Sequence, residues 1–77
     1  MNRLTDQKSR VEFGEKLKQA REKKDMSQAQ VALLVQIHSN YYARIERGDA
    51  NPSLDILLKI AKALGIQASK TLMSHES

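Results

Sequence analysis

Apolar residues recur at helical spacing along the first part of this chain. Phe13, Leu17 and Ala20 follow one another at i, i+4 and i+7, which predicts a helix with one buried stripe. Ser9 begins a Ser-x-x-Glu sequence, the pattern of a capping box, so we expect the helix to start there. Asp25 is expected to end it, because aspartate tolerates the left-handed backbone better than most residues.

Two shorter helices are expected next. Ser27 begins a second capping box, Ser-x-x-Gln, and the helix after it should end near Gln36. Its inward-facing residues are expected to be Val31, Ala32 and Val35. The third helix should begin at about His38 or Ser39 and end at Gly48, a residue that favours the left-handed conformation after a helix.

The clearest amphipathic stripe lies in the second half of the chain. Pro52 cannot continue a helix and Ser53 can cap a new one, which Gly65 should end. The segment "ASKTLM" is expected to form a last short helix. No alternating strand pattern and no internal repeat is visible, so the sequence predicts an all-α fold with five helices. The stripe consists of Leu54, Leu57, Ile60, Ala61 and Leu64.

Composition limits the class of protein further. The 77 residues suffice for one small domain, and the absence of cysteine excludes disulfides and thiolate zinc sites. No stretch reaches the roughly 18 apolar residues of a membrane span, and no signal peptide is visible. A soluble, cytoplasmic protein is therefore expected, without contact to a membrane. The net charge of +4 suits a polyanionic partner.

The expected second and third helices suggest what that partner is. Two short helices joined by a tight turn, the second polar and basic, are typical of a helix-turn-helix. On a helical wheel the third helix has an apolar side with Tyr42 and Ile45. Its opposite side is polar and basic. That side consists of Asn40, Ala43, Arg44 and Arg47.

Several linked segments resemble one known family. They are "GEKLKQAREKKDMSQ", "VALLVQI", "RIERGDANPSLDILLKIAKALGI" and a terminal "LM". From Phe13 to about Leu72 the chain resembles a Cro/C1-type helix-turn-helix domain, the lambda-repressor-like fold of five helices. The resemblance implies a DNA-binding domain at 9–74 with its motif at 28–47. Residues 1–8 would be a flexible arm and 75–77 a frayed tail.

The resemblance also implies a function. It is that of a sequence-specific transcriptional regulator acting as a homodimer on a near-palindromic operator in double-stranded DNA, with a recognition helix at about 39–47 in the major groove. Ile66, Leu72 and Met73 are apolar near the end of a small chain and are expected to form the dimer interface. Arg21 and Glu46 would form a partly buried ion pair between the first and third helices.

The same resemblance assigns DNA contacts to individual residues. Arg44 and Arg47 could also be only a solvated helix face, and Tyr41 could lie flat on the surface. His38 is expected at the start of the recognition helix, near a phosphate. Base contacts are implied for Ser39, Asn40, Ala43 and Arg44, and phosphate contacts for Gln28, Tyr41, Arg47 and backbone amides near Asn51.

Some residues depart from the family pattern. Gln36 and Asp25 occupy positions where glycine is common, so each must accept or avoid a positive φ at some cost. Leu33 and Leu34 replace the usual polar residues, and we expect them to be at least partly exposed. They keep open two alternatives. The protein could be a DNA-binding antitoxin whose partner protein docks on these leucines, or a protein-interaction module on the same fold.

An enzyme or metalloprotein is not expected. Ser39, His38 and Asp49 could be drawn as a catalytic set, but neighbouring helical residues point in different directions and so small a chain offers little pocket. The two histidines, His38 and His75, have no cysteine or carboxylate partners at ligand spacing. No metal and no cofactor are therefore expected.

Overall fold

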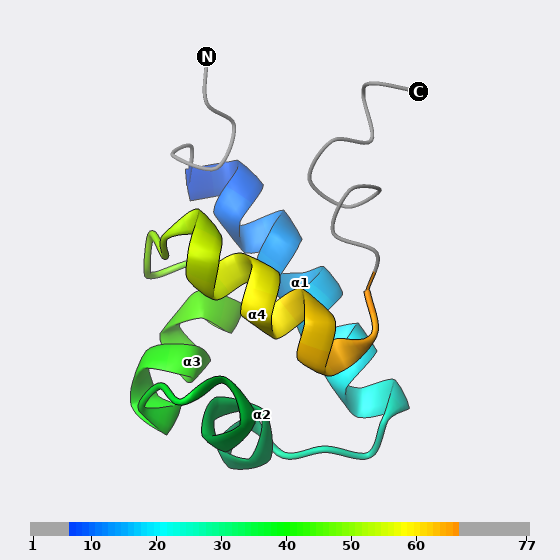
Figure 1. Ribbon diagram of the computed structural model, residues 1–77. Coiled ribbons are helices and arrows are strands. Elements are labelled where there is room, and N and C mark those ends of the chain that lie inside the picture. Colours follow the sequence, from blue (N-terminus) through cyan, green and yellow to red (C-terminus); the bar gives the residue numbers. More distant parts are fainter. Residues whose placement is uncertain (1–6, 67–77) are drawn as a thin grey trace.

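Residues 7–66 are the part of the chain that the computed structural model describes, and they form α-helices without a β-strand (Figure 1). The all-α class is therefore confirmed for these residues. The fifth helix expected at "ASKTLM" lies outside the described residues, as do Leu72 and Met73. The four described helices are α1 (Gln7–Lys23), α2 (Gln28–Val35), α3 (Ser39–Arg47) and α4 (Leu54–Leu64).

Side-chain caps fix where three of the helices begin. Ser27 Oγ accepts from the Gln30 amide at 3.0 Å while Gln30 Oε1 accepts from the Ser27 amide at 2.7 Å, which completes the expected capping box. His38 caps α3 and Ser53 caps α4. The cap expected at Ser9 is wrong. Helix α1 already begins at Gln7, because Gln7 and Lys8 are good helix formers, so Ser9 lies within its first turn.

Left-handed residues end the turns between the helices. Gly48 and Gly65 take φ values of 79° and 71° directly after α3 and α4. Asp25 and Gln36 take φ values of 55° and 62°. Both therefore accept a positive φ, which the sequence analysis expected them either to accept at some cost or to avoid. For a residue with a Cβ this conformation costs about 1–2 kcal/mol. The tight turn between α2 and α3 is thus bought with some strain at Gln36.

The core lies where α1 and α2 pack against α3 and α4. Its largest fully buried side chains are those of Tyr42, Leu17, Ile60 and Val31. One expectation needs correction here. Leu54 is 59% exposed, because it lies at the first position of α4 beyond the edge of the core. Tyr42, which was expected on the apolar side of the third helix, is 0% exposed, and its hydroxyl is buried.

Helix α1 crosses α3 at backbone contact. A Cβ atom on Gly14 would collide with the carbonyl oxygen of Glu46 and would lie 2.8 Å from that of Ile45. Both obstacles are main-chain atoms, which cannot rotate away as a side chain can. Glycine at this position therefore sets how closely the third helix is held against the first.

Candidate nucleic-acid interface

Helices α2 and α3 form a compact pair at one end of the molecule (Figure 1). Gln36, Ile37 and His38 join them, and the Ile37 amide donates to the Ala32 carbonyl at 3.0 Å to close the turn. Helix α3 buries one side against the core and turns the other to solvent. Its buried residues are Tyr42, Ile45 and Glu46, and its exposed residues are Asn40, Arg44 and Arg47.

The residues expected to read bases all lie along α3. Asn40 and Arg44 are exposed, while Ser39 and Ala43 are half-buried. The Arg44 guanidinium is already engaged, since its Nη2 donates to the main-chain oxygen of Asp49 at 2.9 Å. The helix therefore presents a narrow polar strip with one arginine folded toward its C-terminal end.

The residues expected to hold phosphates surround this strip. His38 is exposed, and its Nδ1 accepts from the Asn40 amide at 3.1 Å. In the neutral ring the other nitrogen, Nε2, then carries the proton and can donate. Arg47 and Asn51 are exposed beside the end of α3, whereas Tyr41 is half-buried against the core.

Gln28 differs from the other expected phosphate contacts, because its amide serves the fold. Its Nε2 donates to Glu46 Oε1 at 2.9 Å, across 18 positions of sequence. A primary amide has two N–H groups, so one remains for another acceptor. Sequence reasoning missed this bond, since only the packing of α2 against α3 brings the two side chains together.

Glu46 is the centre of a buried polar cluster. Arg21 donates from Nε to Glu46 Oε2 at 2.7 Å and from Nη2 to Oε1 at 3.1 Å, the paired geometry that gives strong ion pairs. The third donor, Nη1, reaches the Met26 carbonyl at 2.9 Å. Only 12% of the Arg21 side chain and 4% of the Glu46 side chain are exposed. The pair joins α1 to the helix that carries the polar strip.

The cluster shifts the acid–base properties of its members. Burial alone would raise the pKa of Glu46, but the hydrogen bonds from Arg21 and Gln28 outweigh it and leave that pKa below its ordinary value. Burial and the Glu46 carboxylate raise the pKa of the Tyr42 hydroxyl. This hydroxyl has no hydrogen bond of good geometry to any described residue. The Glu46 carboxylate thus stays charged. Its charge is paired with Arg21 inside the fold and is not exposed to solvent beside the polar strip.

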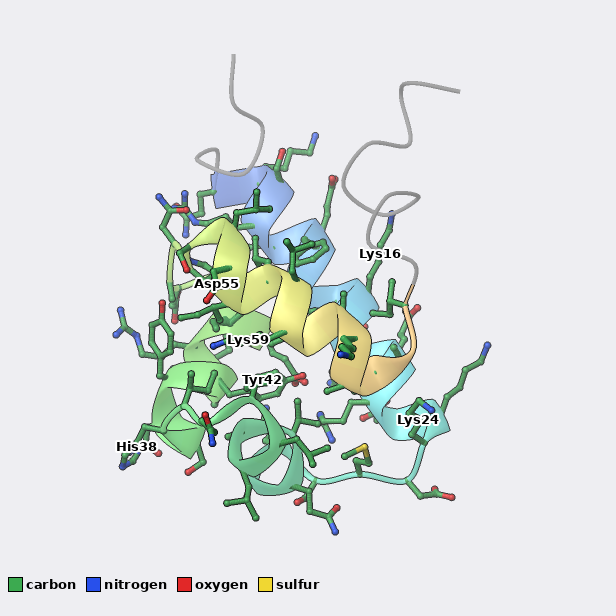
Figure 2. All side chains as sticks on the ribbon, in the orientation of Figure 1. Lys16, Lys24, His38, Tyr42, Asp55 and Lys59 are labelled. Atoms are coloured by element: carbon green, nitrogen blue, oxygen red, sulfur yellow. The ribbon has the colours of Figure 1, made fainter. Side chains whose placement is uncertain are left out.

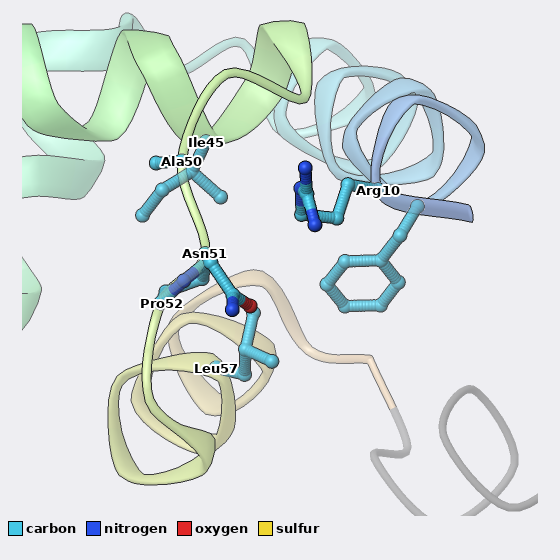
Figure 3. A pocket seen from close by; sticks show the side chains of 7 residues that line it. Arg10, Ile45, Ala50, Asn51, Pro52 and Leu57 are labelled. Carbon is cyan, nitrogen blue, oxygen red and sulfur yellow. The ribbon is translucent and has the colours of Figure 1, made fainter. Parts of the chain in front are cut away.

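Two hollows lie on the described surface, and the smaller of them has no room for a substrate molecule. One is a cavity of about 10 Å³, room for about one water, beside the loop that follows α3. Figure 3 shows the side chains that line it. It is lined by Arg10, Phe13, Ile45, Ala50, Asn51, Pro52 and Leu57. The other is an open groove between the end of α2 and α4, where Figure 2 shows Lys59.

Leu33 and Leu34 lie on α2, and Leu34 lines that groove. They are 78% and 61% exposed, so their expected exposure is confirmed. Within residues 7–66 there is no group of three or more His, Cys, Asp or Glu placed to bind a metal. No helix of this part of the chain is long and apolar enough to cross a bilayer.

A short capped helix, a tight left-handed turn and a second helix with a buried back and a basic front define a helix-turn-helix protein. Comparison with known families agrees. The helix-turn-helix family matches residues 17–70, and the chain belongs to this family, in its Cro/C1-type branch.

Individual relatives are regulatory proteins. Control protein C.BamHI of Bacillus amyloliquefaciens is 45% identical over 64 residues, which cover 82% of this chain and 79% of that one. Control protein C.MunI of a Mycoplasma species is 44% identical over 68 residues, covering 87% and 92%. The immunity repressor protein of Bacillus phage phi105 is 41% identical over 68 residues, covering 82% of this chain and 47% of the repressor.

A solved structure shares the fold. The crystal structure of the restriction-modification controller protein C.AhdI from Aeromonas hydrophila matches with a TM-score of 0.75 and 38% identity, over 79% of this chain and 92% of that one. Together with the family membership, these relatives make the protein a DNA-binding transcriptional regulator and not an enzyme.

Proposed function

We propose that this protein binds a near-palindromic operator as a homodimer, with α3 of each subunit in the major groove. The observation that supports this proposal most is that α3 has one buried side and one exposed polar side. Tyr42, Ile45 and Glu46 anchor it to the core, so its exposed polar strip is held rigidly and points away from the domain. The similarity to control proteins and a phage repressor supports a role in regulating transcription through such sites.

Each exposed side chain of the strip has a role in this proposal. Asn40 can pair with adenine, and Arg44 can donate two hydrogen bonds to the O6 and N7 of a guanine. Ser39 and Ala43 fit close to the base edges because they are small. His38 can donate from Nε2 to a phosphate at the start of α3, and Arg47 and the Asn51 main chain can hold the backbone near its end. Tyr41 and the free N–H of Gln28 are further candidates for phosphate contact.

Truncation should separate the two arginines. Arg44→Ala is expected to weaken the best site by about 1–3 kcal/mol per half-site and to flatten the preference at one base pair, since a bidentate base contact is lost. Arg47→Ala is expected to weaken all sequences alike and to reduce the salt-dependence slope by about one unit, since a phosphate contact is lost. The measurement is a set of binding isotherms at several salt concentrations, on a site selected from random DNA and on a scrambled site.

Lys24→Ala is the charge-matched control for both variants. Figure 2 shows Lys24 at the end of α1, on the opposite side of the molecule from His38. Its loss should change both affinities by no more than the general effect of one surface charge. If Arg44→Ala and Arg47→Ala bind both sites as the wild type does, the polar strip is only a solvated surface and the proposal fails.

The homodimer can be tested by sedimentation. Ile66 is half-buried, and with Leu72 and Met73 it is our proposed interface. A two-fold interface would place the recognition helices about 34 Å apart, one turn of DNA. The wild type should sediment as a dimer at high micromolar concentration, and Leu72→Asp and Met73→Asp should give folded monomers. A folded wild-type monomer at that concentration would contradict the dimer.

A partner protein remains the second candidate, on one observation. Leu33 and Leu34 are large, exposed and adjacent, and together they begin to form a contact surface. The relatives, by their names, give an antitoxin role no support. DNA binding without a second kind of protein is therefore the function that these relatives favour.

A further inference from the structure

Both arginines of the DNA-facing strip are held by one residue, Asp49. Gly48 turns the chain back at the end of α3, so that the Asp49 amide donates to the Arg44 carbonyl at 2.8 Å. In return, Arg44 Nη2 donates to the Asp49 main-chain oxygen at 2.9 Å. Arg47 Nε donates to the Asp49 carboxylate, at Oδ2, at 3.2 Å. The main chain of Asp49 thus fixes the Arg44 guanidinium, and the Asp49 carboxylate pairs with the Arg47 guanidinium.

The Asp49 carboxylate also lies where a negative charge is unexpected. Its side chain is 52% exposed beside Arg47, at the end of the helix that would lie against DNA phosphates. The other acidic residue of this region, Glu46, is buried and neutralised by Arg21. A carboxylate at Asp49 therefore competes with DNA for the same guanidinium.

We propose that the Asp49 carboxylate competes with DNA for the Arg47 guanidinium. A DNA phosphate must displace this carboxylate before it can bind Arg47. This inference rests on the proposed function, because it assigns Arg47 to a phosphate. The competition lowers the affinity for DNA of every sequence, since a phosphate contact carries no sequence information. Less protein is then held at non-specific sites, and a higher concentration is needed before any site is filled.

Asp49→Asn tests the proposal without disturbing the turn, because the main-chain bonds to Arg44 remain and asparagine is well tolerated in turns. The variant should bind both the selected and the scrambled site more tightly, by about 1.5- to 5-fold per subunit, the range expected for an exposed ion pair. Asp55→Asn is the matched control. Asp55 is also exposed and also pairs with a basic side chain, Lys59 at 3.5 Å, but on α4.

A double-mutant cycle shows whether the gain passes through Arg47. In an Arg47→Ala background, Asp49→Asn should no longer tighten binding. A gain of the same size in that background means that the carboxylate merely repels phosphates, and it overturns the proposal. So does an equal gain from Asp55→Asn, or no gain from Asp49→Asn in a wild type that binds its site specifically. A wild type that binds no DNA at all overturns the proposed function as well, so the two failures are distinguishable.

Discussion

Glu46→Gln should destabilise the fold more than any surface substitution. Removing one partner of a buried ion pair costs about 3–5 kcal/mol, and the lower end is expected here because Arg21 keeps some contact with solvent. Arg21 would be left with its charge and without a counter-ion, and Gln28 would lose a charged acceptor. Thermal denaturation should show a melting temperature lowered by at least about 12 °C, given the usual shift for domains of this size.

Glu22→Gln is the control, since Glu22 is exposed on the same helix as Arg21 and its loss should stay within about 0.5 kcal/mol. Equal melting temperatures for the two variants would refute the structural role of the pair.

The contribution of Glu46 to the stability of the fold depends on pH with a defined sign. Because the folded-state pKa of Glu46 is lowered, its contribution is complete above the ordinary value of 4.5 and is lost as pH falls through the folded-state pKa. The difference in melting temperature between Glu46→Gln and the wild type should therefore become smaller as the pH falls through the folded-state pKa of Glu46.

Gly14→Ala should also lower the free energy of unfolding of the domain, although alanine is the better helix former by about 1 kcal/mol. The new Cβ would meet the main chain of Glu46 and Ile45, so α1 and α3 would have to move apart along their whole contact. Overpacking of this kind costs about 1–3 kcal/mol, and here the upper end is expected because the obstacles are backbone atoms. Chemical denaturation at equilibrium measures the difference.

Glu15→Ala, an exposed change in the same turn of α1, separates the steric effect from helix propensity. It should leave stability within about 0.5 kcal/mol of the wild type. A Gly14→Ala variant that is as stable as the wild type, or more so, would show that propensity outweighs the close helix crossing and would contradict the packing described above.

Apart from the cap at Ser9, the sequence predicted the features that depend on residues close together in the chain. The box at Ser27, the start of α3 at His38 and the ends at Gly48 and Gly65 depend on residues two to five positions apart, and the structure has them where expected. The inward face of α2 follows from the same helical periodicity. These local signals, with the family resemblance, were enough for the helix-turn-helix.

Of the contacts between distant parts of the chain, the Arg21–Glu46 ion pair was expected from the family resemblance, but the others were not predictable from the sequence. Gln28 is joined to Glu46 only because α2 packs on α3, and nothing in the sequence near either residue indicates it. Leu54 fits the periodic stripe of α4, yet it is exposed because it lies at the first position of that helix, beyond the edge of the core. The hold of Asp49 on both arginines required the course of the chain after Gly48, which residue types alone do not give.

The two-sided construction of α3 has a consequence for how such regulators diverge. Asn40, Arg44 and Arg47 are exposed, whereas Tyr42, Ile45 and Glu46 carry the packing. Under the proposed function, a lineage can therefore exchange the outward side chains and acquire a new target while its stability is retained. Two paralogues in one cell would need to differ at only a few such positions to avoid acting on each other's genes.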